Sequence, residues 1–255
     1  MTSPFTIKTL RFLRALKRNN DREWFRARKT QYEADVRQPM IELLDRLARD
    51  FTSFAPDFVA EPKVSLYRIY RDTRFSADKT PLKTHVAAHF PMRGFPRGDG
   101  GGLYVEVAPT WVWMGGGLYM PSSPQLRAIR SHIADTHPQL HRLVTTAAFR
   151  KTVGALGGER LSRVPRGYAS DHPAAHYLQF KQFLAGREFD AEFATRPAFY
   201  RELVATFRAV APMVRFLNGA LQTADATPAP EPPTGRPTRD RSQTAARRPV
   251  PAPMW

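Results

Sequence analysis

The sequence predicts an α+β domain in which long amphipathic helices pack against a mostly antiparallel sheet. Hydrophobic residues make up 42% of the 255 residues, enough for a sizeable core and too many for a wholly disordered chain. Several long segments repeat apolar residues at steps of three and four, the period of a helix. Two short segments flank a Pro-Thr turn as in a hairpin, which pairs antiparallel strands. We expect a single folded domain over residues 3–221.

The N-terminal part is predicted to be helical. Residues 5–16 have the apolar spacing of a short amphipathic helix. Asn20 and Glu23 have the spacing of a capping box, which predicts that Asn20 caps a second helix. Apolar residues then recur over 25–51, which predicts a long amphipathic helix bent near Pro39.

Three strands are predicted in the central part. Residues 64–70 carry apolar side chains on both faces, which is typical of a strand inside a sheet. Residues 103–108 and 111–114 form the predicted hairpin, and the glycine runs 100–102 and 115–117 lie at its outer ends. The spacing of these glycines fits neither a P-loop nor a dinucleotide-binding fingerprint.

The C-terminal half is predicted to be largely helical. A helix begins at Ser123, next to a proline suited to the first turn, and breaks near His137. Residues 171–173 are suited to capping a short helix. The apolar spacing over 199–217 predicts a final helix, which Asn218 and the following glycine should end.

The composition changes after Thr223. Eight of the 23 prolines fall in the last 32 residues, and apolar residues become sparse. A segment of this kind buries too little apolar surface to offset the entropy lost on folding. We therefore expect residues 222–255 to be a disordered tail rich in proline and arginine.

Charge and residue content narrow the function classes. The chain has 39 Lys and Arg against 23 Asp and Glu, a formal net charge of +16, which attracts phosphates and other anions. It contains no cysteine, which excludes disulfide scaffolds, Cys-ligated zinc, iron–sulfur clusters and thiol catalysis. No apolar run reaches the length of about 18 residues that a membrane span needs. We expect a basic cytoplasmic protein without a membrane partner.

Residues 68–85 form the densest polar segment, and they follow a predicted strand end, where binding sites are often built. Arginine and lysine suit phosphate or carboxylate groups, and nearby hydroxyls add donors. The predicted ligand-binding residues are Arg68, Arg71, Arg74, Lys79, Lys83 and, from the hairpin, Glu106. The predicted catalytic residues are Asp72 and Asp78, which would orient cations or act as bases, and His85, since histidine titrates near neutrality.

Four segments, in order along the chain, carry recognisable motifs. They are residues 12–25, the run Tyr-Arg-Ile-Tyr-Arg-Asp-Thr-Arg-Phe-Ser within 67–84, residues 115–121 and residues 165–173. Together they resemble an uncharacterised family, the domain of unknown function 2461, over residues 5–218. The resemblance implies one domain and no assigned activity. The family usually has tyrosine at the position of Leu82. If that hydroxyl contacts a substrate, we expect this chain to differ from the family in affinity or activity.

Two pairs of histidines raise the question of a metal site. His85 and His89 are four residues apart, and so are His172 and His176. Zinc needs a third ligand, and the sequence has no His-Glu-x-x-His motif. We therefore assign no metal site, and the sequence indicates neither a particular cofactor nor an oligomeric state.

The hairpin supplies a second group of candidates. Tyr104 and Glu106 should share one face of a strand, where the carboxyl is either exposed or a partner of the basic segment. Aromatic residues beside basic ones can stack exposed bases, although aromatic residues in strands are far more often cross-strand packing. Here they are Tyr104, Trp111, Trp113 and Tyr119.

Three functions stay open on the residues alone. The first is a domain that binds a phosphorylated or other anionic ligand through residues 71–85, with or without chemistry. The second is a nucleic-acid-binding module that uses distributed arginines and the hairpin aromatics. The third is a structural or adaptor protein in which the polar segment is a salt-bridge network that holds a long loop in place.

Overall fold

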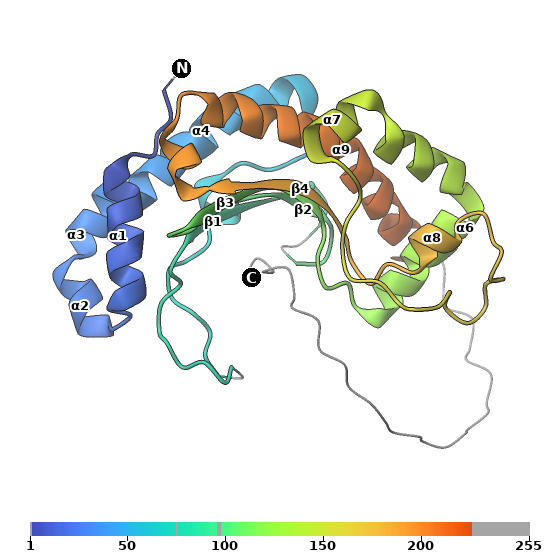
Figure 1. The fold of residues 1–255 in the computed structure, drawn as a ribbon, viewed down its shortest axis with the longest axis horizontal. Helices are drawn as coiled ribbons and strands as arrows, with labels where there is room; N and C mark the ends of the chain where they lie inside the picture. The colour runs from blue at the N-terminus through green and yellow to red at the C-terminus, as the bar shows by residue number, and fades with distance from the viewer. Residues whose placement is uncertain (1, 75, 96–97, 226–255) are drawn as a thin grey trace.

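The computed structural model describes residues 2–74, 76–95 and 98–225. Its centre is a four-stranded antiparallel sheet in the order β1-β2-β3-β4. The strands are β1 (Val86–Pro91), β2 (Gly102–Val107), β3 (Trp111–Leu118) and β4 (Phe183–Asp190). Figure 1 shows the sheet as an arch with helices along its convex side. The predicted α+β class is confirmed.

The predicted hairpin is present as β2 and β3, and it is longer than expected. Val107 pairs with Val112 next to the turn, and Gly102 pairs with Gly117 at the far end. Neither β1 nor β4 was predicted, because alanine, glycine and proline within them are weak strand formers. Pairing with β2 and β3 makes these segments strands.

The N-terminal helices follow the prediction in part. They are α1 (Ile7–Arg18), α2 (Arg22–Ala27), α3 (Lys29–Tyr32), the π-helical turn η1 (Glu33–Arg37) and α4 (Gln38–Phe54). The predicted cap at Asn20 is wrong, since Asp21 caps α2 by accepting from the amides of Glu23 and Trp24. Pro39 follows the π-helical turn η1 directly, so the regular helix is disturbed just before the predicted bend. Proline has no N–H for the carbonyl of Asp35, four residues earlier, and the Thr9 hydroxyl donates to that carbonyl at 2.6 Å. The chain is also interrupted earlier, at Arg28.

The predicted strand over residues 64–70 is wrong. Its first two residues belong to a short helix, α5 (Pro62–Ser65), which begins at a proline. The chain beyond α5 is extended but pairs only at single positions, Leu66 with Ala88 and Tyr70 with Leu82. Ile69 is buried whereas Tyr70 is 48% exposed, so the apolar residues on both faces do not mark a strand within the sheet.

The C-terminal half contains α6 (Ser123–Thr145), α7 (Ala147–Val153), α8 (Ala175–Leu178), the 3-10 turn η2 (Ala191–Thr195) and α9 (Ala198–Asp225). α6 begins at Ser123 as predicted and is kinked at Thr136, next to the predicted break. The stop predicted at Asn218 is wrong, because α9 continues to Asp225. The first four residues of the predicted disordered tail, 222–225, belong to α9 instead, and the rest of the predicted tail lies outside the described residues.

The two faces of the sheet have different chemistry. On the convex face, Phe90 packs against Phe51 of α4 and Phe207 of α9, with ring centroids 5.4 and 5.3 Å apart. The residues between, which alternate to the concave face, are polar, small or aromatic. The strand register sets His89 opposite Tyr104 and Glu106 opposite Trp113. The helices therefore take the apolar face and leave the polar one to line a hollow.

Within the described ranges, no helix is both long enough and apolar enough to cross a lipid bilayer.

Candidate functional site

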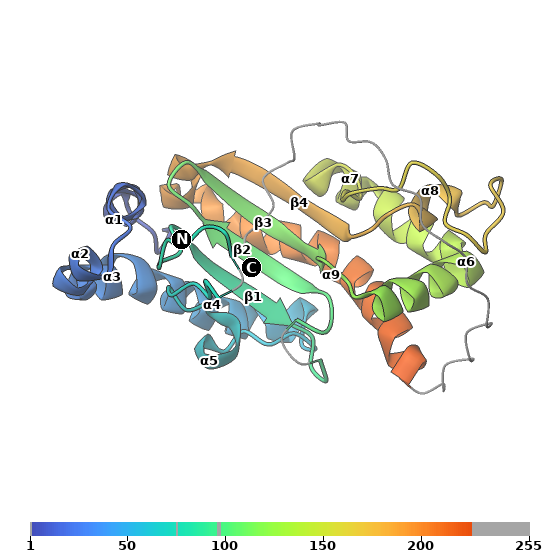
Figure 2. The same ribbon diagram turned by 90° about the horizontal axis from the view of Figure 1, so that it is seen from below.

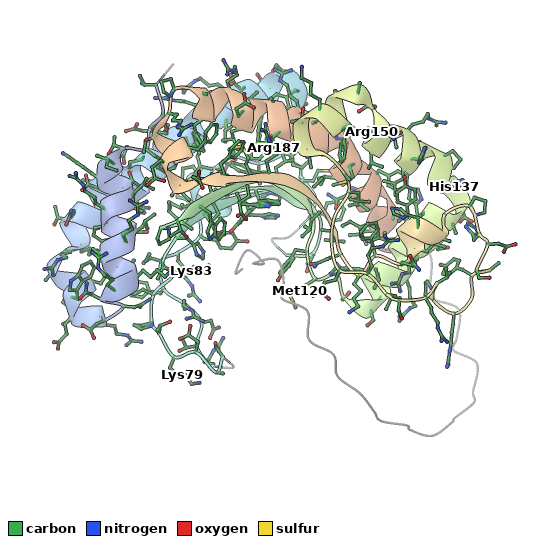
Figure 3. All side chains as sticks on the ribbon, in the orientation of Figure 1. Lys79, Lys83, Met120, His137, Arg150 and Arg187 are labelled. Atoms are coloured by element: carbon green, nitrogen blue, oxygen red, sulfur yellow. The ribbon has the colours of Figure 1, made fainter. Side chains whose placement is uncertain are left out.

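The concave face of the sheet, seen in Figure 2, is hollowed by two adjoining cavities. The larger cavity has a volume of about 410 Å³ and lies against the polar loop over residues 68–85. The smaller cavity, of about 260 Å³, lies against β2 and β3. Both are bounded by Tyr119 and Met120. Figure 3 shows Lys83 and Met120 on opposite sides of this hollow, which we call the groove.

Backbone pairing holds the polar loop in place as one wall of the groove. The Arg71 amide donates to the Pro81 carbonyl at 3.0 Å, and the Lys83 amide donates to the Ile69 carbonyl at 2.8 Å. Asn20 adds a clamp: its side chain donates to the Leu82 carbonyl at 2.8 Å and accepts from the Leu82 amide at 3.0 Å. The loop is thus tied both to itself and to the turn between α1 and α2.

Arg71 is the centre of an ionic network within the loop. Its guanidinium contacts the carboxylate of Asp78 and the hydroxyl of Thr80. Asp78 also accepts from the Thr80 amide at 2.9 Å. The Thr80 amide and the Arg71 side chain hold the pKa of Asp78 at about 2. Asp78 is therefore a fixed anion that orients Arg71, and it is too weak a base to take up a proton near neutral pH.

Asp72 and Arg74 form a second pair farther out on the loop. Arg74 Nε and Nη2 donate to the Asp72 carboxylate at 3.0 and 2.7 Å. Hydrogen bonds from Arg74 lower the pKa of Asp72 to about 2. The Arg74 side chain is 77% exposed, so this is a solvent-exposed ion pair within a turn. Lys79, near the loop tip in Figure 3, donates to the Thr73 carbonyl at 3.0 Å.

The structure divides the nine predicted site residues into three groups. Arg71, Asp72 and Asp78 lie on the wall of the larger cavity. Arg68, Arg74 and Lys79 are exposed. Among the described residues, they do not line either cavity of the groove. Lys83 and His85 line the larger cavity near the sheet, and Glu106 lies beside His85.

Glu106 is the most buried of these groups, with 1% of its side chain exposed. The Tyr104 hydroxyl donates to its Oε2 at 2.5 Å, and His85 Nδ1 lies 3.3 Å from its Oε1. Burial raises the pKa of Glu106 to about 7, although Tyr104 and Lys83 oppose the shift. Burial, with Lys83 and Arg71, lowers the pKa of His85 to about 4. Both shifts favour neutral forms, so this contact is not an ordinary salt bridge.

Lys83 brings positive charge to the same place. Its Nζ lies 4.4 Å above the ring of Tyr67, which lines the smaller cavity, while Lys83 itself lines the larger one. Its charge lowers the pKa of both His85 and Glu106. Lys83 therefore sits at the junction of the two cavities, within electrostatic reach of the buried pair.

The smaller cavity has an aromatic floor. Tyr104 lies 5.9 Å from Trp113 and 6.3 Å from Tyr67, measured between ring centroids. Trp113 lies flat over the sheet because its neighbours lack side chains: a Cβ on Gly115 or Gly186 would come within 2.7 or 2.5 Å of the indole. The glycine run thus serves the packing of this ring.

Sequence reasoning did not single out Tyr67 and Met120, which line the smaller cavity. It named Tyr119 among the hairpin aromatics and weighed His89 only as a metal ligand beside His85, and both line this cavity. The predicted shared face of Tyr104 and Glu106 is correct, and the same alternation in β1 would have found His89. Because no strand was predicted over β1, the alternation could not be applied to His89. Met120 has φ of 49°, a left-handed conformation that is unfavourable for a side-chain-bearing residue and frequent at functional sites.

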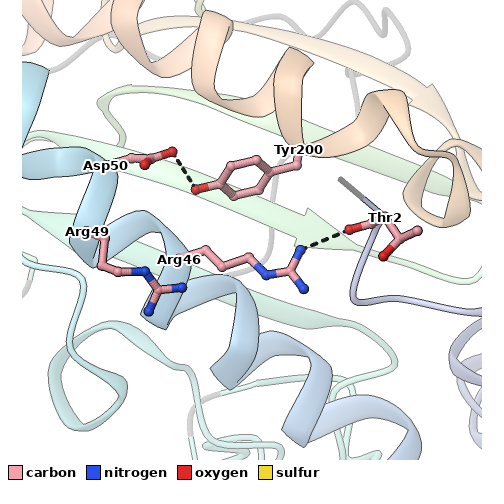
Figure 4. Close-up of a pocket in the computed structure, with 5 residues that line it drawn as sticks. All are labelled: Thr2, Arg46, Arg49, Asp50 and Tyr200. Atoms are coloured by element: carbon pink, nitrogen blue, oxygen red, sulfur yellow. Dashed lines mark hydrogen bonds between the residues drawn. The ribbon is translucent and has the colours of Figure 1, made fainter.

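A third cavity, of about 290 Å³, lies between the N-terminus, α4 and α9 (Figure 4). Three of its polar side chains, those of Tyr200, Asp50 and Arg46, have protein hydrogen-bond partners. The Tyr200 hydroxyl donates to Asp50 at 2.8 Å, and Arg46 donates to the Thr2 carbonyl at 2.9 Å. These contacts give it a structural role, so the groove is the stronger candidate site.

The histidine pairs do not form a metal centre among the described residues, which contain no cluster of three or more potential ligands. His172 Nδ1 accepts from the Ala174 amide at 3.0 Å, next to α8. His176 Nδ1 lies 3.0 Å from Arg160 Nη2. His85 and His89 belong to the groove.

This arrangement defines an α+β protein whose helices cover one face of a sheet and whose other face forms a groove. The sequence profile of the family described as conserved hypothetical protein (DUF2461) matches residues 8–216, and the chain belongs to that family. No curated protein matches the chain. At Leu82, the side chain is 1% exposed and packs in the core while it borders the larger cavity. A tyrosine there would bring a hydroxyl to the cavity edge.

Proposed function

We propose that the groove binds a small anionic molecule. Its anionic group lies in the larger cavity beside Lys83, and the rest of the molecule extends over the aromatic floor of the smaller cavity. The observation that carries this proposal is the position of Lys83, which lines the larger cavity and lies over the Tyr67 ring of the smaller one. One cation thus serves both compartments.

The surroundings of Lys83 favour an anion. Arg71 is oriented toward the same wall by Asp78, and Thr80 and Thr84 border the cavity. The formal net charge of the chain, +16, adds long-range attraction. Phosphate and carboxylate are the groups that such lysine, arginine and hydroxyl donors bind. We expect a phosphorylated or carboxylated ligand.

The aromatic floor favours a ligand with a flat part. Ring faces of tyrosine and tryptophan gain most from contact with planar unsaturated groups. The smaller cavity, at about 260 Å³, is large enough for one ring system and too small for an extended polymer. A ligand with a ring and an acidic group, such as a mononucleotide or an aromatic acid, fits both compartments.

Binding of phosphate, benzoate and adenosine monophosphate, measured by calorimetry at fixed salt, tests the proposal. We expect Lys83→Met to weaken binding of at least one of these anions by about tenfold or more, since it removes the charge and keeps the length of the side chain. Lys63→Met, which removes an exposed charge on α5, is the matched control. Equal affinity in both variants, or no binding of any anion, contradicts the proposal.

An oligonucleotide in the same panel distinguishes the nucleic-acid alternative. Binding that falls steeply with salt and does not depend on Lys83 would place the function on distributed arginines. The adaptor alternative predicts that no small molecule in the panel binds and that the groove variants affect only stability.

A further inference from the structure

We propose that His85 and Glu106 form a proton-transfer pair, in which His85 Nε2 exchanges a proton with the anionic ligand and the Glu106 carboxyl exchanges one with His85 Nδ1. This inference rests on the proposed function, since the ligand must lie in the larger cavity. It makes the groove a catalytic site that performs acid–base chemistry.

The Glu106 side chain lies between the two cavities of the groove. Its Oε1 lies 3.3 Å from His85, which lines the larger cavity, and its Oε2 accepts from Tyr104, which lines the smaller one. Burying a carboxyl in a sheet is costly unless its oxygens are contacted. This carboxyl has one contact toward each compartment, which is the arrangement of a relay.

One ring nitrogen of His85, Nε2, is available for a ligand. Its side chain is 6% exposed, and Nε2 has no hydrogen-bond partner among the described residues. A buried polar atom without a partner costs free energy, so such atoms are rare, and a catalytic role is one of the explanations for them. Nδ1, on the other side of the ring, is the nitrogen that faces Glu106.

The protonation state of Glu106 sets the tautomer of His85. When Glu106 is a neutral acid, its proton points to Nδ1, and Nε2 carries the other proton and is a donor. When Glu106 is ionised, Nδ1 carries the proton, and Nε2 is a bare base. The imidazole is neutral in both states, as its buried position requires.

The proton-transfer step balances without a charged imidazole. Nε2 takes a proton from an acidic C–H or O–H of the ligand as the electron pair of that bond stays on the ligand. The Nδ1 proton moves to the Glu106 carboxylate, which becomes a neutral acid. One negative charge passes from Glu106 to the ligand, and the reverse sequence returns the proton.

The charged and titratable groups around the pair suit this transfer. Lys83 and Arg71 act on His85 from the polar loop, and Lys83 also acts on Glu106. Tyr104 contacts Glu106 along β2, and His89 faces Tyr104 from β1. Lys83 is therefore placed to stabilise the charge that develops on the ligand. The class of reaction is proton abstraction next to a phosphate or carboxylate, as in an isomerisation or elimination.

Nitrogen NMR of the imidazole groups in the full-length protein tests the pair directly. We expect His85 to stay neutral between about pH 5 and pH 8 and to change tautomer as Glu106 ionises within that range. Glu106→Gln should lock Nε2 in the protonated form, because the amide donates to Nδ1. Glu188→Gln, which changes an exposed carboxylate on β4, is the control and should keep the tautomer change. A single tautomer of wild-type His85 throughout, or an imidazolium, overturns the pair.

Calorimetry with inorganic phosphate in two buffers of different ionisation enthalpy tests the exchange with a ligand. We expect wild-type protein to take up a fraction of a proton on binding phosphate near neutral pH, because the bound anion favours a protonated Nε2, and we expect no uptake in Glu106→Gln. Phosphate binding without proton uptake in the wild type overturns the exchange. Absence of phosphate binding, together with an intact tautomer change, counts against the anion site and not against the pair.

Discussion

Burial of the Glu106 carboxyl lowers the stability of the fold when the carboxyl is ionised. A carboxyl in the middle of a strand is usually exposed, whereas this one is buried beneath the wall formed by the polar loop. The Tyr104 hydroxyl satisfies one oxygen at 2.5 Å, but burial still favours the protonated form. The same residue therefore links stability to pH and places a weak acid where a ligand would bind.

The stability of the protein should depend on the ionisation of Glu106. Its pKa rises from 4.5 in the unfolded chain to about 7 in the fold. The unfolded state therefore loses its proton first, so stability falls as pH rises from 4.5 to about 7 and is then constant. We expect Glu106→Gln to be more stable than the wild type by up to about 3 kcal/mol above pH 7, and equal to it near pH 4.5.

Urea unfolding at both ends of this range measures the difference. His85 acts in the opposite sense in both proteins, because its lowered pKa makes stability fall as pH falls from 6.5 to about 4. The comparison between variants removes most of that contribution. Glu188→Gln should show no such crossover, and the same pH dependence in Glu106→Gln and wild type would contradict a buried titrating carboxyl.

At the level of elements, two asparagines fix the loops that border the groove. Asn20 pairs with both backbone groups of Leu82, and Asn218 does the same for Gly101, accepting at 2.7 Å and donating at 3.0 Å. Each amide replaces one rung of a strand. The sequence pattern suggested a helix start at Asn20 and a helix stop at Asn218, which are the commoner uses of asparagine.

Asn20→Ala should loosen the polar loop. Two hydrogen bonds to a buried residue are lost, so we expect a decrease in stability of about 2 kcal/mol and weaker anion binding. Asn19→Ala, which removes a hydrogen bond from an exposed side chain one residue earlier, should cost less and leave binding unchanged. Thermal unfolding and calorimetry of both variants decide this, and equal effects would show that the clamp does not position the loop.

The glycines of β3 and β4 should be required for the aromatic floor. In Gly186→Ala, the new Cβ would lie within 2.5 Å of the Trp113 indole and 2.6 Å of the Met114 carbonyl. We expect a loss of about 1–3 kcal/mol and a shift of tryptophan fluorescence as the ring is displaced. Gly219→Ala in α9 meets open space and should stabilise the protein by up to about 1 kcal/mol. Unchanged fluorescence in Gly186→Ala would contradict the role of these glycines.

For the whole molecule, the arch of the sheet separates stability from the proposed function. The helices cover the convex face of the sheet (Figure 1) and bury the core against it, while the concave face carries His89, Glu106 and the aromatic floor. Among the residues of α9 whose burial is described, the last buried apolar one is Leu221, and the family match ends at residue 216. The domain over 3–221 stays a prediction.

Deletion of residues 226–255 should therefore leave the fold and the groove intact. We expect the shortened protein to unfold within about 2 °C of the full chain, since the family match ends at residue 216, before the deleted segment. Anion affinity should also be unchanged. Differential scanning calorimetry and the anion panel measure both, and a large loss of stability or affinity would assign the C-terminal residues to the domain or the groove.

Local patterns in the sequence were sufficient for several elements. The apolar period of α1, the start of α6 at Ser123 and the hairpin of β2 and β3 depend on neighbours in the chain, and each was predicted. The alternation of β2 also placed Tyr104 and Glu106 on one face. The polar segment was recognised as a candidate site, and part of it borders the larger cavity.

The remaining features depend on contacts between distant residues. The strands β1 and β4 have weak local propensity and exist because β2 and β3 pair with them. Which predicted cations reach the groove depends on the loop geometry, which brings Lys83 inward and leaves Arg74 in solvent. The sequence by itself determined the fold class, the helical periods and the hairpin. Tertiary structure alone decided that His85 and Glu106 meet as buried side chains, because burial and the contact between the polar loop and the sheet are properties of the assembled fold.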